Sequence, residues 1–138
     1  MPRPRKGVCS MTRPDRATIL FRKASQDELV LERLLADADV DDDTLGFHAQ
    51  QAAEKLLKAL LCARGVDYPR THSLGVLVEL LGTAGEALPG IVGDLNRLTP
   101  FGTTFRYDDD FLGASFNRAE WLTTIRALRE FVESRMGV

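Results

Sequence analysis

The chain has 138 residues, of which 44% are hydrophobic, and this suffices for one compact domain that buries roughly two thirds of its unfolded surface. Its apolar runs are far shorter than the roughly 18 residues that span a membrane, and its arginine-rich start lacks a signal-peptide core, so we expect a soluble, cytoplasmic protein. Two cysteines, Cys9 and Cys62, provide neither a disulfide framework nor a CxxC metal pair, which indicates a reducing compartment.

The net charge of −2 conceals an uneven distribution of charge along the chain. Residues 1–23 carry seven basic side chains and one acidic side chain, a net charge of +6, and the remaining residues carry −8. We expect residues 1–13 to form a basic, disordered arm and residues 14–138 to form a single helical domain. Such an arm can attract nucleic acid by neutralising phosphates, although most Pro- and Arg-rich arms are only disordered, and Met1 and Met11 are alternative start sites.

Apolar residues recur at helical spacing along the chain, and no run of four to eight residues alternates as a strand, so the sequence predicts an all-α fold. The first helix is expected after Arg13-Pro14, and it runs to about Leu35. The acid-rich stretch DADVDDD that follows resembles a calcium loop. Because the EF-hand pattern needs glycine at its sixth position, where Asp42 stands, we expect no metal site. These carboxylates suit instead the positive N-terminal end of the next helix.

The second predicted helix starts near Thr44 and ends at about Arg64, just before Gly65. A helical wheel separates an apolar arc from a narrow polar stripe. The arc contains Ala49, Ala52, Ala53, Leu56, Leu57, Leu60 and Leu61, and the stripe contains His48, Gln51, Lys55 and Lys58. The alanines of the arc allow a neighbouring helix to approach closely.

A short third helix, capped by Thr71 or Ser73, is predicted to run to Leu81, and a fourth is predicted over about Leu88–Leu98. Residues 99–115, TPFGTTFRYDDDFLGAS, form the longest predicted loop, and long loops in compact domains are often functional. The last helix is expected from Asn117 to the C-terminus, with Glu120 placed as in a capping box. We interpret the aromatic residues of this region as core or dimer-interface residues: Phe101, Phe105, Phe111, Phe116 and Trp121.

Residues 47–81, FHAQQAAEKLLKALLCARGVDYPRTHSLGVLVELL, resemble the central signature of HEPN domains, in which an HAxQAAEKxLKALL helix is followed by a loop and a TH-(D/S)-L helix. The later FRYDDD is similar to the arginine-tyrosine loop of that family. The resemblance covers roughly residues 15–136. It implies a five-helix antiparallel (up-and-down) bundle that usually dimerises, with a polar and basic cleft at or near the dimer interface. It also implies frequent pairing with a minimal nucleotidyltransferase in toxin–antitoxin systems.

Many HEPN proteins are metal-independent ribonucleases with an R-x(4–6)-H motif, in which the histidine transfers a proton and the arginine stabilises the phosphorane-like charge. In this sequence both histidines, His48 and His72, precede Arg106. Counted from Arg64, His72 lies one residue beyond the allowed spacing. We therefore expect a member of the family without the nuclease motif, and no catalytic residues.

Six residues are candidates for binding a ligand: His48, Gln51, Lys55, Lys58, Arg106 and Tyr107. The stripe on the second helix offers contacts for a phosphate or a base edge, and the arginine-tyrosine pair offers a guanidinium and a ring for stacking. Structural roles remain open for the same residues. Lys58 can pair with Glu54 along the helix, His72 can cap or pin a loop, and Arg106 can pair with the neighbouring aspartates.

Three functions remain open, and none requires a cofactor. We favour a non-catalytic HEPN protein that binds a nucleotide, an RNA or a partner nucleotidyltransferase as part of a toxin–antitoxin-like or regulatory pair. The second function is a divergent ribonuclease toxin that uses Arg106 with His72 or His48 brought near in space. The third is a purely structural homodimer.

Overall fold

The structure, a computed structural model, describes residues 12–103 and 116–137, so the predicted arm up to Met11 lies outside the described residues. The described residues form an all-α bundle without strands, as the sequence predicts. Its α-helices are α1 (Arg13–Arg33), α2 (Asp42–Ala63), α3 (Leu74–Thr83), α4 (Thr99–Thr103) and α5 (Arg118–Met136). Two short 3₁₀ helices, η1 (Gly90–Val92) and η2 (Leu95–Leu98), precede α4. No described helix is long and apolar enough to cross a membrane.

Side-chain caps fix the start of three helices. Thr12 caps α1 through a bond from the backbone N–H of Asp15, so this helix begins at Arg13 and holds its proline within the first turn, where no N–H donor is needed. Ser73 caps α3 and Asn117 caps α5, as predicted. The helix α2 begins at Asp42, two residues before the predicted start, with two aspartates in its first turn.

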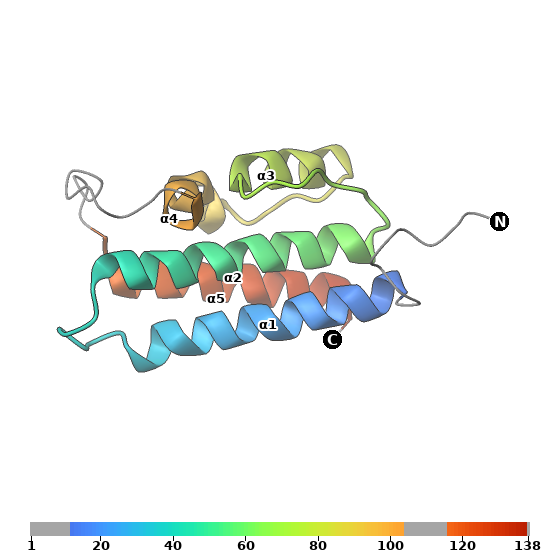
Figure 1. The fold of residues 1–138 in the computed structure, drawn as a ribbon. Helices are drawn as coiled ribbons and strands as arrows, with labels where there is room; N and C mark the ends of the chain where they lie inside the picture. The colour runs from blue at the N-terminus through green and yellow to red at the C-terminus, as the bar shows by residue number, and fades with distance from the viewer. Residues whose placement is uncertain (1–11, 104–115, 138) are drawn as a thin grey trace.

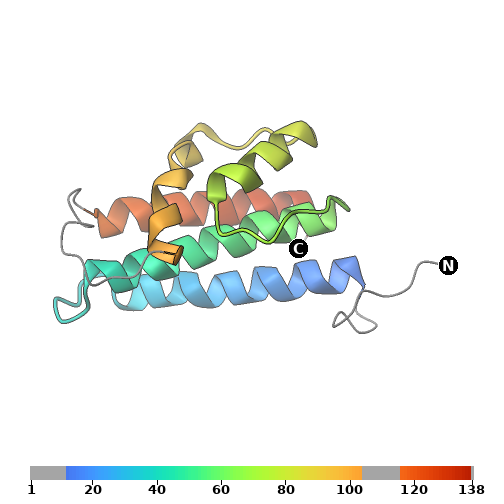
Figure 2. The same ribbon diagram turned by 45° about the horizontal axis from the view of Figure 1, so that its top comes forward.

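The helix α2 is the centre of the bundle. The helices α1 and α5 pack along it, and α3 and α4 lie over its other side (Figures 1 and 2). All seven residues of the predicted apolar arc are buried. The alanines of that arc let the backbones of neighbouring helices come close, and its leucines fill the space between them.

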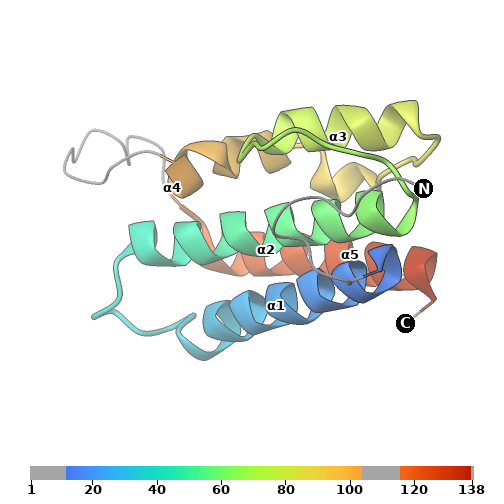
Figure 3. The same ribbon diagram turned by 45° about the vertical axis from the view of Figure 1, so that its right-hand side comes forward.

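Ion pairs at the helix ends define the directions of the three long helices. Arg118 at the start of α5 bonds Asp42 at the start of α2, and Arg129 further along α5 bonds Glu28 of α1. The helix α1 therefore runs antiparallel to both α2 and α5, which share one direction, and the segment between α2 and α5 makes the return. As a result, α1 begins and α5 ends at the same end of the bundle (Figures 1 and 3).

The predicted fourth helix over Leu88–Leu98 is wrong. This stretch contains Pro89, Gly90 and Gly93, which disfavour a continuous α-helix, and it forms η1 and η2 instead. Val92 of η1 and Leu95 and Leu98 of η2 are nevertheless buried, and a spacing of three residues places Leu95 and Leu98 on one face of η2. The predicted loop over 99–115 begins with the short helix α4, and residues 104–115 lie outside the described residues.

Two glycines allow α4 to lie directly on α2. A Cβ atom at Gly46 of α2 would overlap the ring of Phe101, and a Cβ atom at Gly102 of α4 would overlap the carboxamide of Gln50. These contacts seal Gln50, which is fully buried. The side of α2 that carries polar residues is therefore partly covered by α4.

Candidate functional site

The first polar cluster joins α1 to α2 through Asp27. This aspartate is buried, and its two carboxylate oxygens accept bonds from His48 Nδ1 at 2.9 Å and from Lys55 Nζ at 2.6 Å. Both partners come from α2 and remain partly exposed, with side-chain exposures of 28% and 24%. Asp27 therefore fixes where a histidine and a lysine of the predicted stripe point.

The second cluster is built around Glu54 of α2, which is also buried. One carboxylate oxygen accepts bonds from Gln50 Nε2 and His72 Nδ1, both at 2.9 Å, and the other accepts a bond from Lys58 Nζ at 3.0 Å. The backbone carbonyl of His72 also accepts a bond from Gln50 Nε2, at 3.2 Å. Glu54 thus ties the loop between α2 and α3 to the side of α2.

The pKa of the Glu54 carboxyl is lowered below its ordinary value of 4.5. Burial alone would raise this pKa, because it disfavours the charged form. The hydrogen bonds from Gln50, His72 and Lys58, together with the positive charge of Lys58, outweigh burial. Glu54 is therefore ionised at neutral pH and acts only as a hydrogen-bond acceptor.

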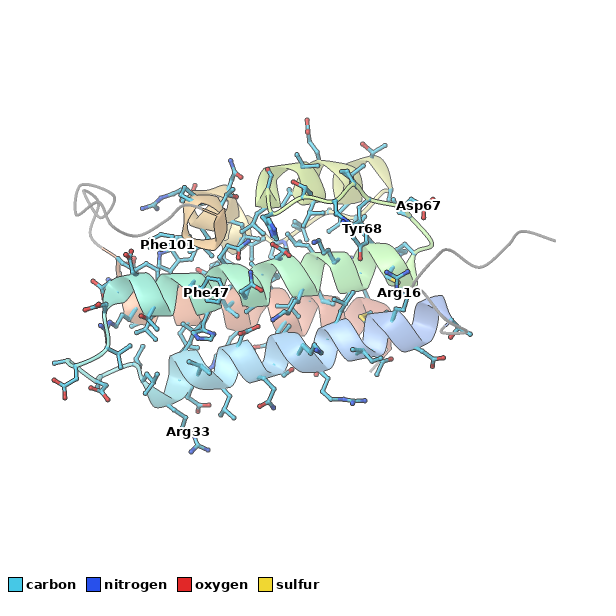
Figure 4. The ribbon with its side chains drawn as sticks, in the orientation of Figure 1. Arg16, Arg33, Phe47, Asp67, Tyr68 and Phe101 are labelled. Carbon is cyan, nitrogen blue, oxygen red and sulfur yellow. The ribbon has the colours of Figure 1, made fainter. Side chains whose placement is uncertain are left out.

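Gln51 and two aromatic residues complete this side of α2. Gln51 Nε2 donates a bond to Gln50 Oε1 at 2.7 Å. The ring of Phe47 is 42% exposed and meets the ring of His48 edge to face, with centroids 5.5 Å apart. Lys58 Nζ lies 5.6 Å from the ring centroid of Tyr68, which belongs to the loop after α2 (Figure 4). We call the surface formed by Phe47, His48, Gln51, Lys55, Lys58 and His72 the polar edge of α2.

The structure brings the stripe residues and His72 to this one edge, but it divides them between two carboxylates. His48 and Lys55 bond Asp27, whereas Lys58 and His72 bond Glu54. Arg106 and Tyr107, the other two predicted ligand-binding residues, lie outside the described residues. Their position relative to the histidines therefore stays a prediction.

Sequence reasoning proposed the Glu54–Lys58 pair, which the structure shows, but it missed that Asp27, Gln50 and Glu54 are buried. For Asp27 a signal was available, because it lies three residues after Ala24 and four before Leu31, both of which are buried on the inner face of α1. For Gln50 a signal was also available, because on the wheel it lies within the apolar arc, between Leu57 and Leu61. Glu54 lies between the arc and the polar stripe, where a glutamate is as typical of exposed helix surface as of a buried network.

Other charged residues are engaged in fastening the bundle. Arg64 is the arginine that comes nearest to the R-x(4–6)-H spacing. It bonds Glu86 at 2.6 Å, and Arg135 near the end of α5 bonds the same carboxylate at 3.2 Å. Glu86 is almost fully buried, and it links the ends of α2 and α5 to the segment after α3. These two arginines are thus paired within the fold.

Of the five aromatic residues interpreted as core or dimer-interface residues, three lie among the described residues and pack against the core. Phe101, Phe116 and Trp121 are half-buried, and their rings form a row with successive centroid distances of 5.5 and 6.3 Å. Arg97 lies over the ring of Trp121 at 5.7 Å. Phe105 and Phe111 lie outside the described residues.

A family model for the HEPN domain matches residues 17–135, which is most of the chain. The chain belongs to the HEPN domain family. No curated protein and no solved structure matches the chain. Membership of the HEPN family indicates a function that involves nucleotides or RNA.

The polar edge is suited to orient a ligand by hydrogen bonds. Lys55 and Lys58 balance the charges of Asp27 and Glu54, so the edge is neutral when both histidines are neutral. Among the described residues, each lysine ammonium uses one donor on its carboxylate and retains others, and each histidine retains its Nε2 atom. Directed hydrogen bonds, rather than a strong positive potential, are what this surface offers.

Proposed function

We propose that this HEPN protein is a non-catalytic binding component that recognises a nucleotide or an RNA at the polar edge of α2. One observation supports the proposal above others: two buried carboxylates, Asp27 and Glu54, hold four partly exposed cationic or imidazole side chains on one surface. A group fixed in this way loses less rotamer entropy when it binds a ligand, which favours affinity.

The proposal also rests on what the chain lacks in sequence. Its histidines, His48 and His72, both precede Arg106, and Arg64 is occupied by Glu86. A general acid or base needs hydrogen-bond reach to the reacting group and an electrophilic partner for the developing charge. The R-x(4–6)-H motif that provides both in related ribonucleases is absent, so we assign binding rather than cleavage.

Thermal unfolding in the presence of ATP, GTP and single-stranded RNA tests this function. A ligand that binds only the folded state at 100 times its Kd stabilises it by about 2.7 kcal/mol and raises Tm. Lys55→Gln and Lys58→Gln should reduce the shift, and Lys23→Gln, an exposed lysine of α1, is the matched control. A Tm that none of these ligands changes would favour a purely structural homodimer.

The alternative to a binding function is a ribonuclease, and the contact between Glu54 and His72 favours it. Glu54 bonds His72 Nδ1 at 2.9 Å, and the histidine side chain is 57% exposed, so its Nε2 atom is available to a substrate. A carboxylate on Nδ1 orients an imidazole for proton transfer in many hydrolases. In this alternative His72 would take the proton of an RNA 2′-hydroxyl, and Arg106 would stabilise the phosphorane charge.

Incubation of labelled RNA with the purified protein distinguishes the two functions. The binding function predicts intact RNA after prolonged incubation with a protein that retains its affinity. Cleavage that is lost in both Arg106→Ala and His72→Ala, while His48→Ala remains active, would establish the nuclease instead. All three variants should be compared at equal helical content.

The assembly belongs to the same proposal. We propose that the chain forms a homodimer and that a minimal nucleotidyltransferase is its partner in a toxin–antitoxin-like or regulatory pair, as the resemblance implies. Light scattering of the purified chain measures the first point. Co-purification with the nucleotidyltransferase encoded beside it, if the genome places one there, measures the second.

A further inference from the structure

A chain of hydrogen bonds that begins at Glu54 fixes the orientation of two glutamine amides. Ionised Glu54 can only accept, and the backbone carbonyl of His72 can only accept, so the atom of Gln50 that meets both must be its NH₂ group. The carbonyl oxygen of Gln50 then faces Gln51. Since that oxygen can only accept, Gln51 must present its own NH₂ group to it.

The orientation of the Gln51 amide is therefore determined by the buried charge of Glu54, which acts on it through two successive hydrogen bonds. Gln51 uses one N–H on Gln50, and among the described residues its second N–H and its Oε1 form no further bond. The side chain is only half-buried. It thus offers a donor beside an acceptor in a fixed order, and a flip of the amide would set two oxygens against each other.

Phe47 places an exposed ring next to this amide. The two residues are four apart on α2, which puts their side chains side by side on one helix face. The ring is 42% exposed and is steadied by its edge-to-face contact with His48. An exposed ring stacks on a nucleobase, and an amide beside it can read the edge of the stacked base.

We propose that Gln51 and Phe47 form a recognition site for an unpaired adenine base. The proposal rests on the function proposed above and names the ligand of the same surface. Stacking favours a purine because of its larger ring area. Adenine places its N6 donor beside the N1 acceptor on one edge and beside the N7 acceptor on the other, so both of its edges complement a glutamine amide. Guanine complements the amide only with the edge that carries O6 and N1–H, because its O6/N7 edge offers only acceptors.

Glu54 is a positioning residue in this site. It does not touch the base, but it determines which way Gln50 and Gln51 are turned. Glu54→Gln replaces an obligate acceptor by an amide that can donate or accept. Both glutamines can then reverse, and we expect the variant to lose its preference among bases while RNA binding itself persists.

The decisive comparison uses labelled single-stranded decamers of adenosine and of N6,N6-dimethyladenosine, measured by fluorescence anisotropy. The methyl groups remove the N6 donor from both edges and leave the stacking ring and all phosphates. We expect the dimethyl decamer to bind about tenfold more weakly than the adenosine decamer, the effect of losing one base-edge contact. AMP and N6,N6-dimethyl-AMP, tested in the same way by competition, tell whether a free nucleotide suffices or a strand is needed.

Variants show whether the difference arises at Gln51. Gln51→Leu should bind both decamers equally, and Gln26→Leu, an exposed glutamine on α1, should keep the tenfold ratio. Phe47→Ala should weaken both decamers. Equal binding of the two decamers by the unaltered protein, or an undiminished ratio in Gln51→Leu, would overturn the adenine site and leave the proposed function intact. Failure to bind any RNA or nucleotide would overturn both.

Discussion

Arg118 determines the path of the chain between α1 and α2. Its guanidinium bonds Asp42 at 2.8 Å and donates to four backbone carbonyls, those of Leu34, Leu35, Asp37 and Val40. The carbonyls at the end of a helix have no partner within the helix, and a cation there also interacts favourably with the helix dipole. One side chain at the start of α5 thus satisfies backbone carbonyls that lie 78 to 84 residues earlier in the sequence.

Arg118→Ala should lower the free energy of unfolding by about 2 kcal/mol, because three of the four carbonyls it serves are partly buried and all of them lose a charged donor. Urea denaturation measures this value. Arg126→Ala is the matched control on the same helix, since its contacts with Glu28 and Glu32 are longer and more exposed, and it should cost about 0.5 kcal/mol. Equal losses in the two variants would contradict the role assigned to Arg118.

Gly102 is important because it has no side chain, which leaves room for the carboxamide of Gln50. Gly102→Ala would push a methyl group into the buried carboxamide of Gln50, and overpacking of this kind costs about 1–3 kcal/mol. Gly82→Ala meets no atom within 4 Å and should be neutral or slightly stabilising. Thermal unfolding of the two variants checks the contrast, and a stable Gly102→Ala protein would mean that α4 can move away from α2.

At the level of elements, hydrophobic spacing predicted α1, α2, α3 and α5 because each has a regular apolar face, and a side chain caps three of them: α1, α3 and α5. The same reasoning failed over Leu88–Leu98, where leucines three residues apart fit an α-helix and a 3₁₀ helix about equally and the glycines decide between them. The polar edge was only partly predictable. Its outward residues were visible on the wheel, but the carboxylates that hold them depend on which face of α1 and which loop pack against α2.

The loop between α2 and α3 should become less firmly attached in acid. The pKa of Glu54 is lowered in the folded protein, so its ionised form stabilises the fold fully above the unfolded value of 4.5. That contribution is lost as the pH falls through the lower, folded value. We therefore expect the stability difference between the unaltered protein and Glu54→Gln to be largest near neutral pH and to shrink below about pH 4.5.

Urea denaturation across a pH series measures this dependence. Glu79→Gln, an exposed glutamate on α3, is the control and should show little difference at any pH. A stability gap for Glu54→Gln that stayed constant down to pH 3 would show that the carboxylate is not what holds the loop.

At the scale of the whole molecule, the separation of charge predicts how RNA binding depends on salt. The polar edge has no net charge when both histidines are neutral, and binding there should then release few counterions, with a slope of log K against log salt no steeper than about −1. The alternative is that the basic residues near the start of the chain bind the phosphates of the RNA. The slope of log K against log salt is then steeper, and deletion of residues 1–11 with their three basic side chains should decrease its magnitude by about 2.

The start of α1 and the end of α5 lie at the same end of the bundle. The order of the helices along the chain can therefore be changed without changing how they pack. A short linker between these two ends would allow the chain to be opened elsewhere without loss of any helix contact. Opening it in the exposed turn at residues 84–85, just after α3, should give a circular permutant with the same helical circular dichroism and cooperative unfolding. Opening the chain within residues 36–40 should prevent folding, because the carbonyls that Arg118 binds at Asp37 and Val40 would then belong to free chain ends.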